Sequence, residues 1–425
     1  WLKETLLPPI SLTRFHHHYS GMMATVLLSY ASFLGGCAAI HTMANQPSPF
    51  AAIVGFMQSK PRDRNAQING CDSLSKYINV SNKAAQEEAT AMGAIDAPIK
   101  AMKRFPQDKQ LMVACSHAVT RPILFHHDNS LRAAKLGGFN LTIAALRKWQ
   151  DDPEVSRLAG DLGAYMNHCS ENRDLFRRLD GVSLLMQFLK DNFHGKKTPS
   201  SLEPVRQSLI GLSSGCWNNQ DLCFDYGFGN LSMQLVQEHT KETEIVERAL
   251  EGAIAGMWAS DVNRVLLVEH GAGEAIVKVL QELPNGSKAV TAACRALTAI
   301  VGPMSLTTPG EAGLPAWKAF HPMLQARVTR AGAVEQLLMT VDKASNVDVS
   351  CLDALTTLAY FNPSNQDIML RANFTGKLAE TVQRRGLTNL MVQSRACNLL
   401  RMMALRDGVA FTTGWTKGAG CTGVI

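Results

Sequence analysis

The sequence predicts an all-α solenoid of about eight helical repeats. A short phrase recurs along the chain: an Asn, seven or eight residues that favour helix, then Gly followed by a small residue. It occurs plainly at Asn172–Gly181, Asn219–Gly227 and Asn263–Gly271, with variants at Asn129–Gly137 and Asn365–Asn373. From Gln46 onward, apolar residues recur at helical spacing, and no strand-like run interrupts them. Repetition of this kind is typical of stacked helical units, which bind other molecules more often than they transform them.

The composition points to a largely covered exterior. Hydrophobic residues make up 46% of the chain and charged residues only 18%. A membrane or a large protein assembly would cover such a surface. The net charge of +6 is spread along the chain without a basic run, so nucleic-acid binding is not expected.

Two segments precede the solenoid. Residues 1–20 contain two prolines and three consecutive histidines, and they are expected to form an extended lead-in. Residues 21–44 are apolar, and Met22–Ile40 is long enough to cross a bilayer as a helix. The serines, glycines and His41 of this segment lower its hydrophobicity, so the alternative is a buried helix that caps the solenoid.

The solenoid is expected over residues 46–408, with one long third helix in each repeat. Most of these helices start about 40 to 60 residues apart, which fits a three-helix unit. The candidates are Asn65–Ile78, Asp108–Arg121, Pro153–Cys169, Glu203–Gly215, Glu242–Ala259, Ser287–Val301, Val347–Phe361 and Leu390–Ala404.

Several segments resemble the armadillo repeat family. Val268–Leu280, Thr329–Leu338 and Ala91–Met102 resemble its entry into the second helix, and Ala292–Ile300 and Cys351–Ala359 resemble its third helix. The resemblance covers Gln46 to about Arg406. It implies a right-handed armadillo-like α-solenoid whose third helices line a concave groove, but it specifies function only weakly.

The recurring Gly and Asn each have an expected mechanical role. Gly would end the short first helix and let the chain turn sharply into the second. Asn would cap the exposed backbone N–H groups of the first helix.

The ten cysteines are expected to be reduced packing residues. Five of them fall at one recurring place inside the third helices: Cys71, Cys115, Cys294, Cys351 and Cys397. A free Cys behaves there as a small hydrophobe. Because the chain has no CxxC pair, and Cys216, Cys223 and Cys169 lack zinc ligands at suitable spacing, no metal site is predicted.

Two non-repetitive segments could bind partners. An insertion at 302–326 is rich in Pro and Gly and carries Trp317 and Phe320, although these aromatics could instead fold back onto their own repeat. The tail at 409–425 is Gly-rich, contains Trp415 and is expected to be extended.

Catalysis is not predicted. The motifs of serine hydrolases, zinc proteases and nucleotide triphosphatases do not occur, and the sequence suggests no cofactor, small-molecule substrate or metal. His126–Asp128 is the most polar cluster at a turn between repeats, and it is interpreted as a solvated loop.

Partner contacts are expected on the groove and on the exposed aromatic residues. The candidates are Arg121, Arg157, Arg206, Trp217, Trp258, Arg295, Trp317, Phe320, Tyr360, Arg395 and Trp415. The predicted lining also includes His117, Ser214, Glu251 and Asp353. The Trp and Asn ladder of nuclear-import receptors is missing: His117 and Gly160 stand where Trp is expected, and Arg121 and Ala164 where Asn is expected.

Taken together, these features predict a non-catalytic scaffold. The main hypothesis is an accessory subunit of a large organellar complex, for example in the mitochondrial inner membrane. It would bind other subunits through the solenoid and membrane lipid around residues 21–44. The alternative is a soluble cytoplasmic adaptor or cytoskeletal scaffold that binds extended peptides.

Overall fold

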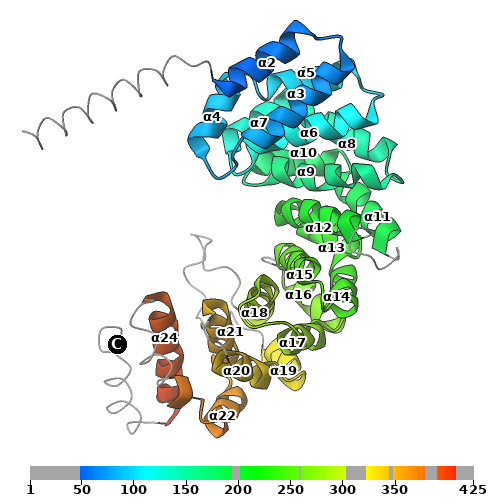
Figure 1. The fold of residues 1–425 in the computed structure, drawn as a ribbon. Helices are drawn as coiled ribbons and strands as arrows, with labels where there is room; N and C mark the ends of the chain where they lie inside the picture. The colour runs from blue at the N-terminus through cyan, green and yellow to red at the C-terminus, as the bar shows by residue number, and fades with distance from the viewer. Residues whose placement is uncertain are drawn as a thin grey trace, which may run out of the picture.

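The chain forms a curved stack of helices (Figure 1). The computed structural model describes residues 48–193, 202–257, 260–302, 322–343, 348–374, 376–378 and 390–407. Within these ranges the structure consists of helices and short turns, with no strand. The predicted all-α solenoid is confirmed, and its unit of three helices is that of an armadillo-like repeat.

Each repeat consists of a short first helix, a second helix and a third helix. The first helices are α4 (Lys83–Ala91), α7 (His127–Lys135), α10 (Ser170–Arg178), α13 (Gln220–Asp225), α16 (Asp261–Glu269), α19 (Pro322–Arg330) and α22 (Pro363–Arg371). The second helices are α2 (Pro49–Ser59), α5 (Asp96–Arg104), α8 (Gly138–Lys148), α11 (Gly181–Phe193), α14 (Phe228–Glu238), α17 (Ala272–Glu282) and α20 (Ala333–Lys343).

The third helices match the predicted segments to within about one helical turn. They are α3 (Arg64–Tyr77), α6 (Lys109–Ile123), α9 (Ser156–Met166), α12 (Glu203–Gly215), α15 (Thr243–Met257), α18 (Lys288–Val301), α21 (Val349–Ala359) and α24 (Leu390–Asp407). Short 3₁₀ turns, η2 (Pro153–Val155) and η4 (Cys216–Asn218), flank two of them. In Figure 1, α15, α18 and α21 lie on the inner side of the curve, and α14, α17 and α20 lie on the outer side.

The turn from the first to the second helix uses a left-handed residue. Five glycines at this point have φ between 81° and 92°: Gly93, Gly137, Gly227, Gly271 and Gly332. Asp180 and Asn373 take the same position in two repeats, with φ of 55° and 49°. The expected role of Gly is confirmed, except that Asp180 rather than Gly181 makes the turn before α11. Gly181 instead leaves room for the Phe176 ring, which a Cβ would approach to 2.1 Å.

The recurring Asn does not cap the first helix, so that expectation is wrong. The residue is buried inside or at the start of the helix, and its amide donates to a carbonyl near the end of the preceding third helix. The pairs are Asn129 to Pro122 (2.9 Å), Asn172 to Tyr165 (2.8 Å), Asn219 to Gly215 (2.9 Å), Asn263 to Gly256 (2.9 Å) and Asn365 to Leu358 (2.8 Å). The Asn therefore satisfies a carbonyl that the helix end would leave unpaired.

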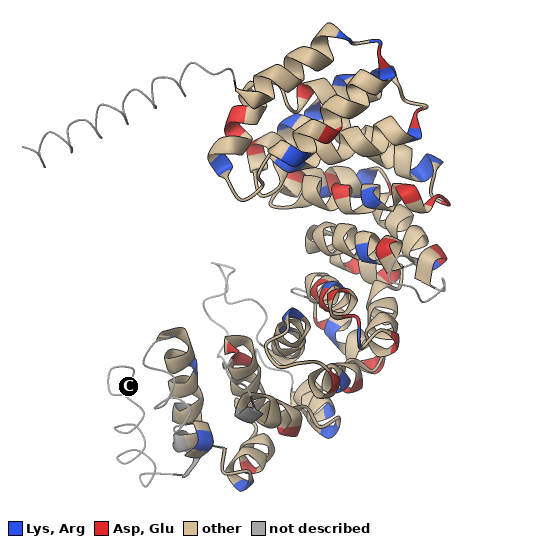
Figure 2. Cartoon of the chain, in the orientation of Figure 1, with Lys and Arg blue, Asp and Glu red and all other residues tan. Residues whose placement is uncertain are grey.

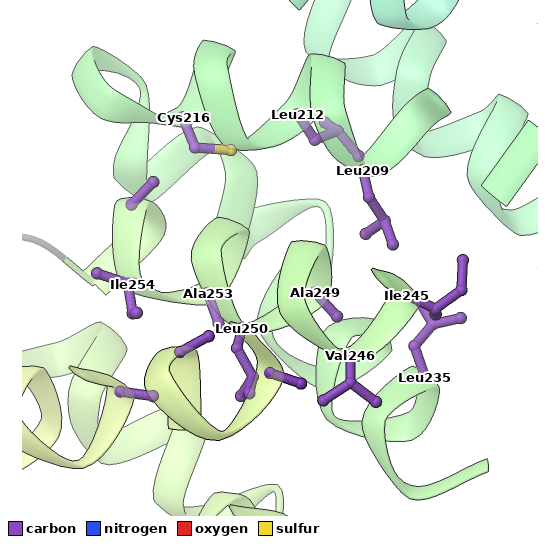
Figure 3. Packing of buried hydrophobic residues seen from close by; sticks show 14 of the residues in the cluster. Leu209, Leu212, Cys216, Leu235, Ile245, Val246, Ala249, Leu250, Ala253 and Ile254 are labelled. Carbon is purple, nitrogen blue, oxygen red and sulfur yellow. The ribbon is translucent and has the colours of Figure 1, made fainter. Parts of the chain in front are cut away.

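One hydrophobic core runs along the stack. Leu209 and Leu212 of α12 face Ile245 and Ala249 of α15 (Figure 3), and all four are almost fully buried. Each repeat thus buries its apolar face against its neighbours rather than in a separate domain core.

The expectation that the cysteines are reduced is wrong, because most cysteines in the described residues form disulfides. Cys71 of α3 bonds to Cys115 of α6, and Cys294 of α18 bonds to Cys351 of α21. The physical reason is the recurring position itself, which sets cysteines of successive third helices side by side, with Cα atoms 4.9 and 4.8 Å apart. Cys216 bonds locally to Cys223, and Cys397 is also disulfide-bonded. Cys169 keeps its thiol.

Several predicted segments lie outside the described residues. These are the lead-in at 1–20, the apolar segment at 21–44, residues 303–321 of the insertion and the tail at 409–425. Residues 322–326, which the sequence places in the insertion, form the start of α19. Among the helices in the described ranges, none has the length and apolarity needed to cross a membrane.

Candidate functional site

A hollow of about 330 Å³ lies where three third helices meet. Its walls come from α6, α9 and α12, and they include the predicted residues Arg121, Arg157 and Arg206. His117 and Ser214, also predicted, line the same hollow. The sequence register is therefore correct here, because residues one repeat apart lie together on one face.

Glycines allow α9 and α12 to approach closely behind this hollow. A Cβ on Gly211 would lie 2.5 Å from the carbonyl oxygen of Ala159, and one on Gly163 would lie 3.1 Å from that of Ile210. Gly160 leaves space for the side chain of Gln207, whose oxygen would lie 1.7 Å from a Cβ. Gly160 thus stands where nuclear-import receptors carry a Trp, and Gln207 of α12 packs against it.

The floor of the hollow contains a buried carboxylate. Asp161 of α9 is only 5% exposed. One of its oxygens lies 3.3 Å from Nδ1 of His117, and Oδ2 has no hydrogen-bond partner within the described residues. Nε of Arg121 is also buried and unpartnered there. Buried polar atoms are nearly always paired, so these two atoms are exceptions within the described residues.

The rim of the hollow carries charges of both signs. Arg206 binds Glu203 at 2.6 Å and Glu244 of the next third helix at 2.8 Å. Burial raises the pKa of Glu203, but hydrogen bonds from Arg206 and Gln207 and the charge of Arg157 outweigh burial, so the pKa lies below its usual value. The carboxylate therefore stays ionised at neutral pH.

Arg157 is the exposed cation of this rim. Because Arg206 is already held by two carboxylates, Arg157 is better placed to meet an incoming ligand. Figure 2 shows that basic and acidic residues are likewise interspersed along the rest of the described solenoid. The groove is thus suited to a ligand of mixed polarity rather than to a polyanion or polycation.

The other predicted contact residues do not join this hollow. Trp217 of η4 is half-buried and packs against the core. Tyr360 ends α21 and stacks edge-on against Phe361, with ring centroids 4.5 Å apart. Arg295 is exposed on α18, and Arg395 of α24 pairs with Asp353 of α21 at 3.2 Å.

Four predicted contacts lie outside the described residues: Trp258, Trp317, Phe320 and Trp415. Two important groove residues, Asp161 and Gln207, were missed from the sequence. Asp161 directly follows the ladder position Gly160, so counting in register would have drawn attention to it. Gln207 gives no such signal, because its role depends on how closely α9 and α12 approach.

The comparisons with known proteins bear on the fold alone. No protein-family model matches the sequence, and no curated protein matches it. Among solved structures, an engineered protein is similar over 89% of this chain and 82% of its own, with 17% identity and a TM-score of 0.62. A designed armadillo repeat protein is 17% identical over 59% of this chain and 94% of its own, with a TM-score of 0.46. At such identity, the likeness to the engineered protein shows a shared fold.

Proposed function

We propose that this chain is a protein-binding scaffold whose concave groove holds an extended segment of a partner. The observation that carries the proposal is the hollow between α6, α9 and α12, with the exposed Arg157 and the partly exposed Arg121 in its lining. An extended peptide offers backbone C=O groups that can accept hydrogen bonds from these guanidinium groups, together with side chains that can fill the space around them.

A displayed library of random peptides would test this proposal. Peptides enriched on the wild-type chain are measured against Arg157→Glu and Arg295→Glu. Both positions are exposed arginines of third helices, but only Arg157 lines the hollow. We expect Arg157→Glu to weaken binding by about tenfold or more, as loss of a central interface residue commonly does, and Arg295→Glu to change it less than about twofold. Failure to enrich any peptide, or equal binding by both variants, would contradict the proposal.

The finer hypothesis is an accessory subunit of an organellar membrane complex, such as one of the mitochondrial inner membrane. Support for membrane attachment comes from the apolar sequence at 21–44. The disulfides between repeats support a compartment that permits oxidation, and they disfavour the alternative of a cytoplasmic adaptor.

Two cell-level measurements separate these alternatives. Alkaline carbonate extraction should leave a membrane-anchored chain in the pellet, and release into the supernatant would count against the anchor. Native gels after mild detergent should show the chain in a large species, and migration as a free 46.3 kDa protein would count against a resident subunit.

A further inference from the structure

Three metal-binding side chains from two successive repeats meet at one edge of the solenoid. His127 is the first residue of α7, Cys169 precedes α10, and Glu171 lies in the first turn of α10. The stacking of repeats brings these residues together across 42 and 44 positions of sequence. No sequence motif links them, and none of them lines the groove between α6, α9 and α12.

The spacing of the three donor atoms suits a tetrahedral ion. Nε2 of His127 lies 3.3 Å from Oε2 of Glu171, and Sγ of Cys169 lies 3.6 Å from the same oxygen. All three atoms lie within 4.8 Å of one another. Zinc bonds of about 2.0–2.1 Å to N and O and about 2.3 Å to S give tetrahedral edges of roughly 3.3 Å for N···O and 3.6 Å for S···O. Two edges are thus already close to their ligand-bound lengths.

The histidine is also oriented as a metal ligand would be. Nδ1 of His127 lies 3.2 Å from Oδ1 of Asp128 and can donate its hydrogen there. Nε2 then presents its lone pair toward Glu171 and Cys169. A carboxylate behind a ligating imidazole is the usual arrangement that fixes the tautomer of zinc-bound histidines.

The residues around the three donor atoms leave them accessible to an ion from solvent. Ser170 donates to Oε2 of Glu171 at 3.2 Å, while the adjacent His168 ring is turned toward Phe125, 5.9 Å between centroids. Cys169 is buried, whereas His127 and Glu171 are about half exposed. An ion can therefore enter from solvent and find one ligand already fixed in the protein.

We propose that His127, Cys169 and Glu171 bind a divalent transition-metal ion of the zinc class, with water as the fourth ligand. Imidazole nitrogen, thiolate and carboxylate are the three ligand types that zinc takes in proteins, and three protein ligands leave one position for water. The ion would clip α7 to α10 and so join two adjacent repeats.

Cobalt(II) is the probe, because a thiolate ligand gives it a charge-transfer absorption that imidazole and carboxylate do not. The full chain is stripped with a chelator and carries Ala at His16, His17 and His18, so that this run of histidines cannot bind the ion. We expect one cobalt per chain with a thiolate band, which excess zinc displaces. Cys169→Ser should abolish the band, and Cys37→Ser should leave it unchanged.

The exposed ligands provide a second measurement that does not depend on the buried cysteine. His127→Ala and Glu171→Gln should each weaken cobalt binding by about tenfold or more, whereas His270→Ala, at the exposed histidine that follows α16, should not. Zinc should raise the melting temperature of the wild type and of His270→Ala, but not of His127→Ala. A wild-type chain without a thiolate band, or a band that survives Cys169→Ser, would overturn the proposal. If His127 and Glu171 form only an ion pair, the wild-type chain will show no thiolate band.

Discussion

At the scale of the residue, the requirement for glycine at a left-handed turn can be tested at Gly271. Gly271 has φ of 81° between α16 and α17, and a side chain there would be strained whatever space surrounds it. We expect Gly271→Val to reduce the free energy of unfolding by about 1–3 kcal/mol, measured by urea denaturation. Gly55 is the control, because it is helical and a Cβ there would meet no atom of another part of the chain within 4 Å. An equal loss at Gly55→Val would mean that the turn is not the cause.

Asp108 gives a prediction for pH dependence. Its carboxylate accepts from the Leu111 amide at 3.0 Å, so it caps α6, and it pairs with Arg64 of α3. Burial raises its pKa, but the Arg64 and Leu111 hydrogen bonds outweigh burial, so the pKa lies below the usual 3.8. The unfolded chain therefore binds this proton more readily, and the contribution to stability is present above pH 3.8 and is lost as the pH falls.

Two substitutions separate charge from capping at Asp108. Asp108→Asn can still cap the helix but cannot titrate, so its stability should fall less steeply than that of the wild type on acidification from pH 5 to about pH 3. Asp108→Ala should in addition lose about 0.5–2 kcal/mol at neutral pH, because the cap is gone. Urea midpoints across this pH range are the measurement. Parallel curves for the wild type and Asp108→Asn would show that the ion pair contributes nothing.

At the scale of the element, the sequence predicts helices well and predicts contacts between helices poorly. Apolar spacing located α12 correctly, at Glu203–Gly215, because burial of one face controls where a helix forms. The roles of Asn172 and Cys71 were misjudged, because each depends on a partner in another helix. Periodicity within one element carries no information about such a partner.

The close pair α9 and α12 gives a prediction at this scale. A Cβ on Gly211 would lie 2.5 Å from the Ala159 carbonyl oxygen and 2.6 Å from a methyl group of Leu185. The backbone cannot yield as a flexible side chain would, so Gly211→Ala should force the helices apart and cost about 1–3 kcal/mol of stability. The same change at Gly55, in open space on α2, should be neutral or slightly stabilising. Equal melting temperatures for the two variants would contradict close backbone packing.

At the scale of the whole molecule, the position of the groove could be predicted from the sequence, but the full set of side chains inside it could not. Counting in register set His117, Arg121 and Arg157 on one concave face, since third helices repeat regularly along the stack. The buried position of Asp161 and the position of Gln207 against Gly160 depend on how closely α9 and α12 approach. This approach is specific to these two helices, so a pattern shared by all repeats does not show it.

Disulfides cross-link some neighbouring third helices of the stack and leave others without a covalent link. Cys71–Cys115 and Cys294–Cys351 each join two successive third helices, across 44 and 57 residues of sequence. Closing loops of this length typically contributes about 2–4 kcal/mol. In a solenoid each repeat contacts only its neighbours, so the loss on reduction should stay near the broken bond.

Hydrogen exchange before and after treatment with a phosphine reductant measures this directly. Protection should fall in α3, α6, α18 and α21, and also around Cys216–Cys223 and Cys397, whose bonds the reductant opens as well. It should change little in α8 and α9, which contain no cysteine. The double variant Cys71→Ala with Cys115→Ala should reproduce the change in α3 and α6 alone. A uniform loss along the chain would show that the solenoid unfolds as one cooperative unit. Unchanged exchange in α3 and α6 would show that packing alone holds these helices together.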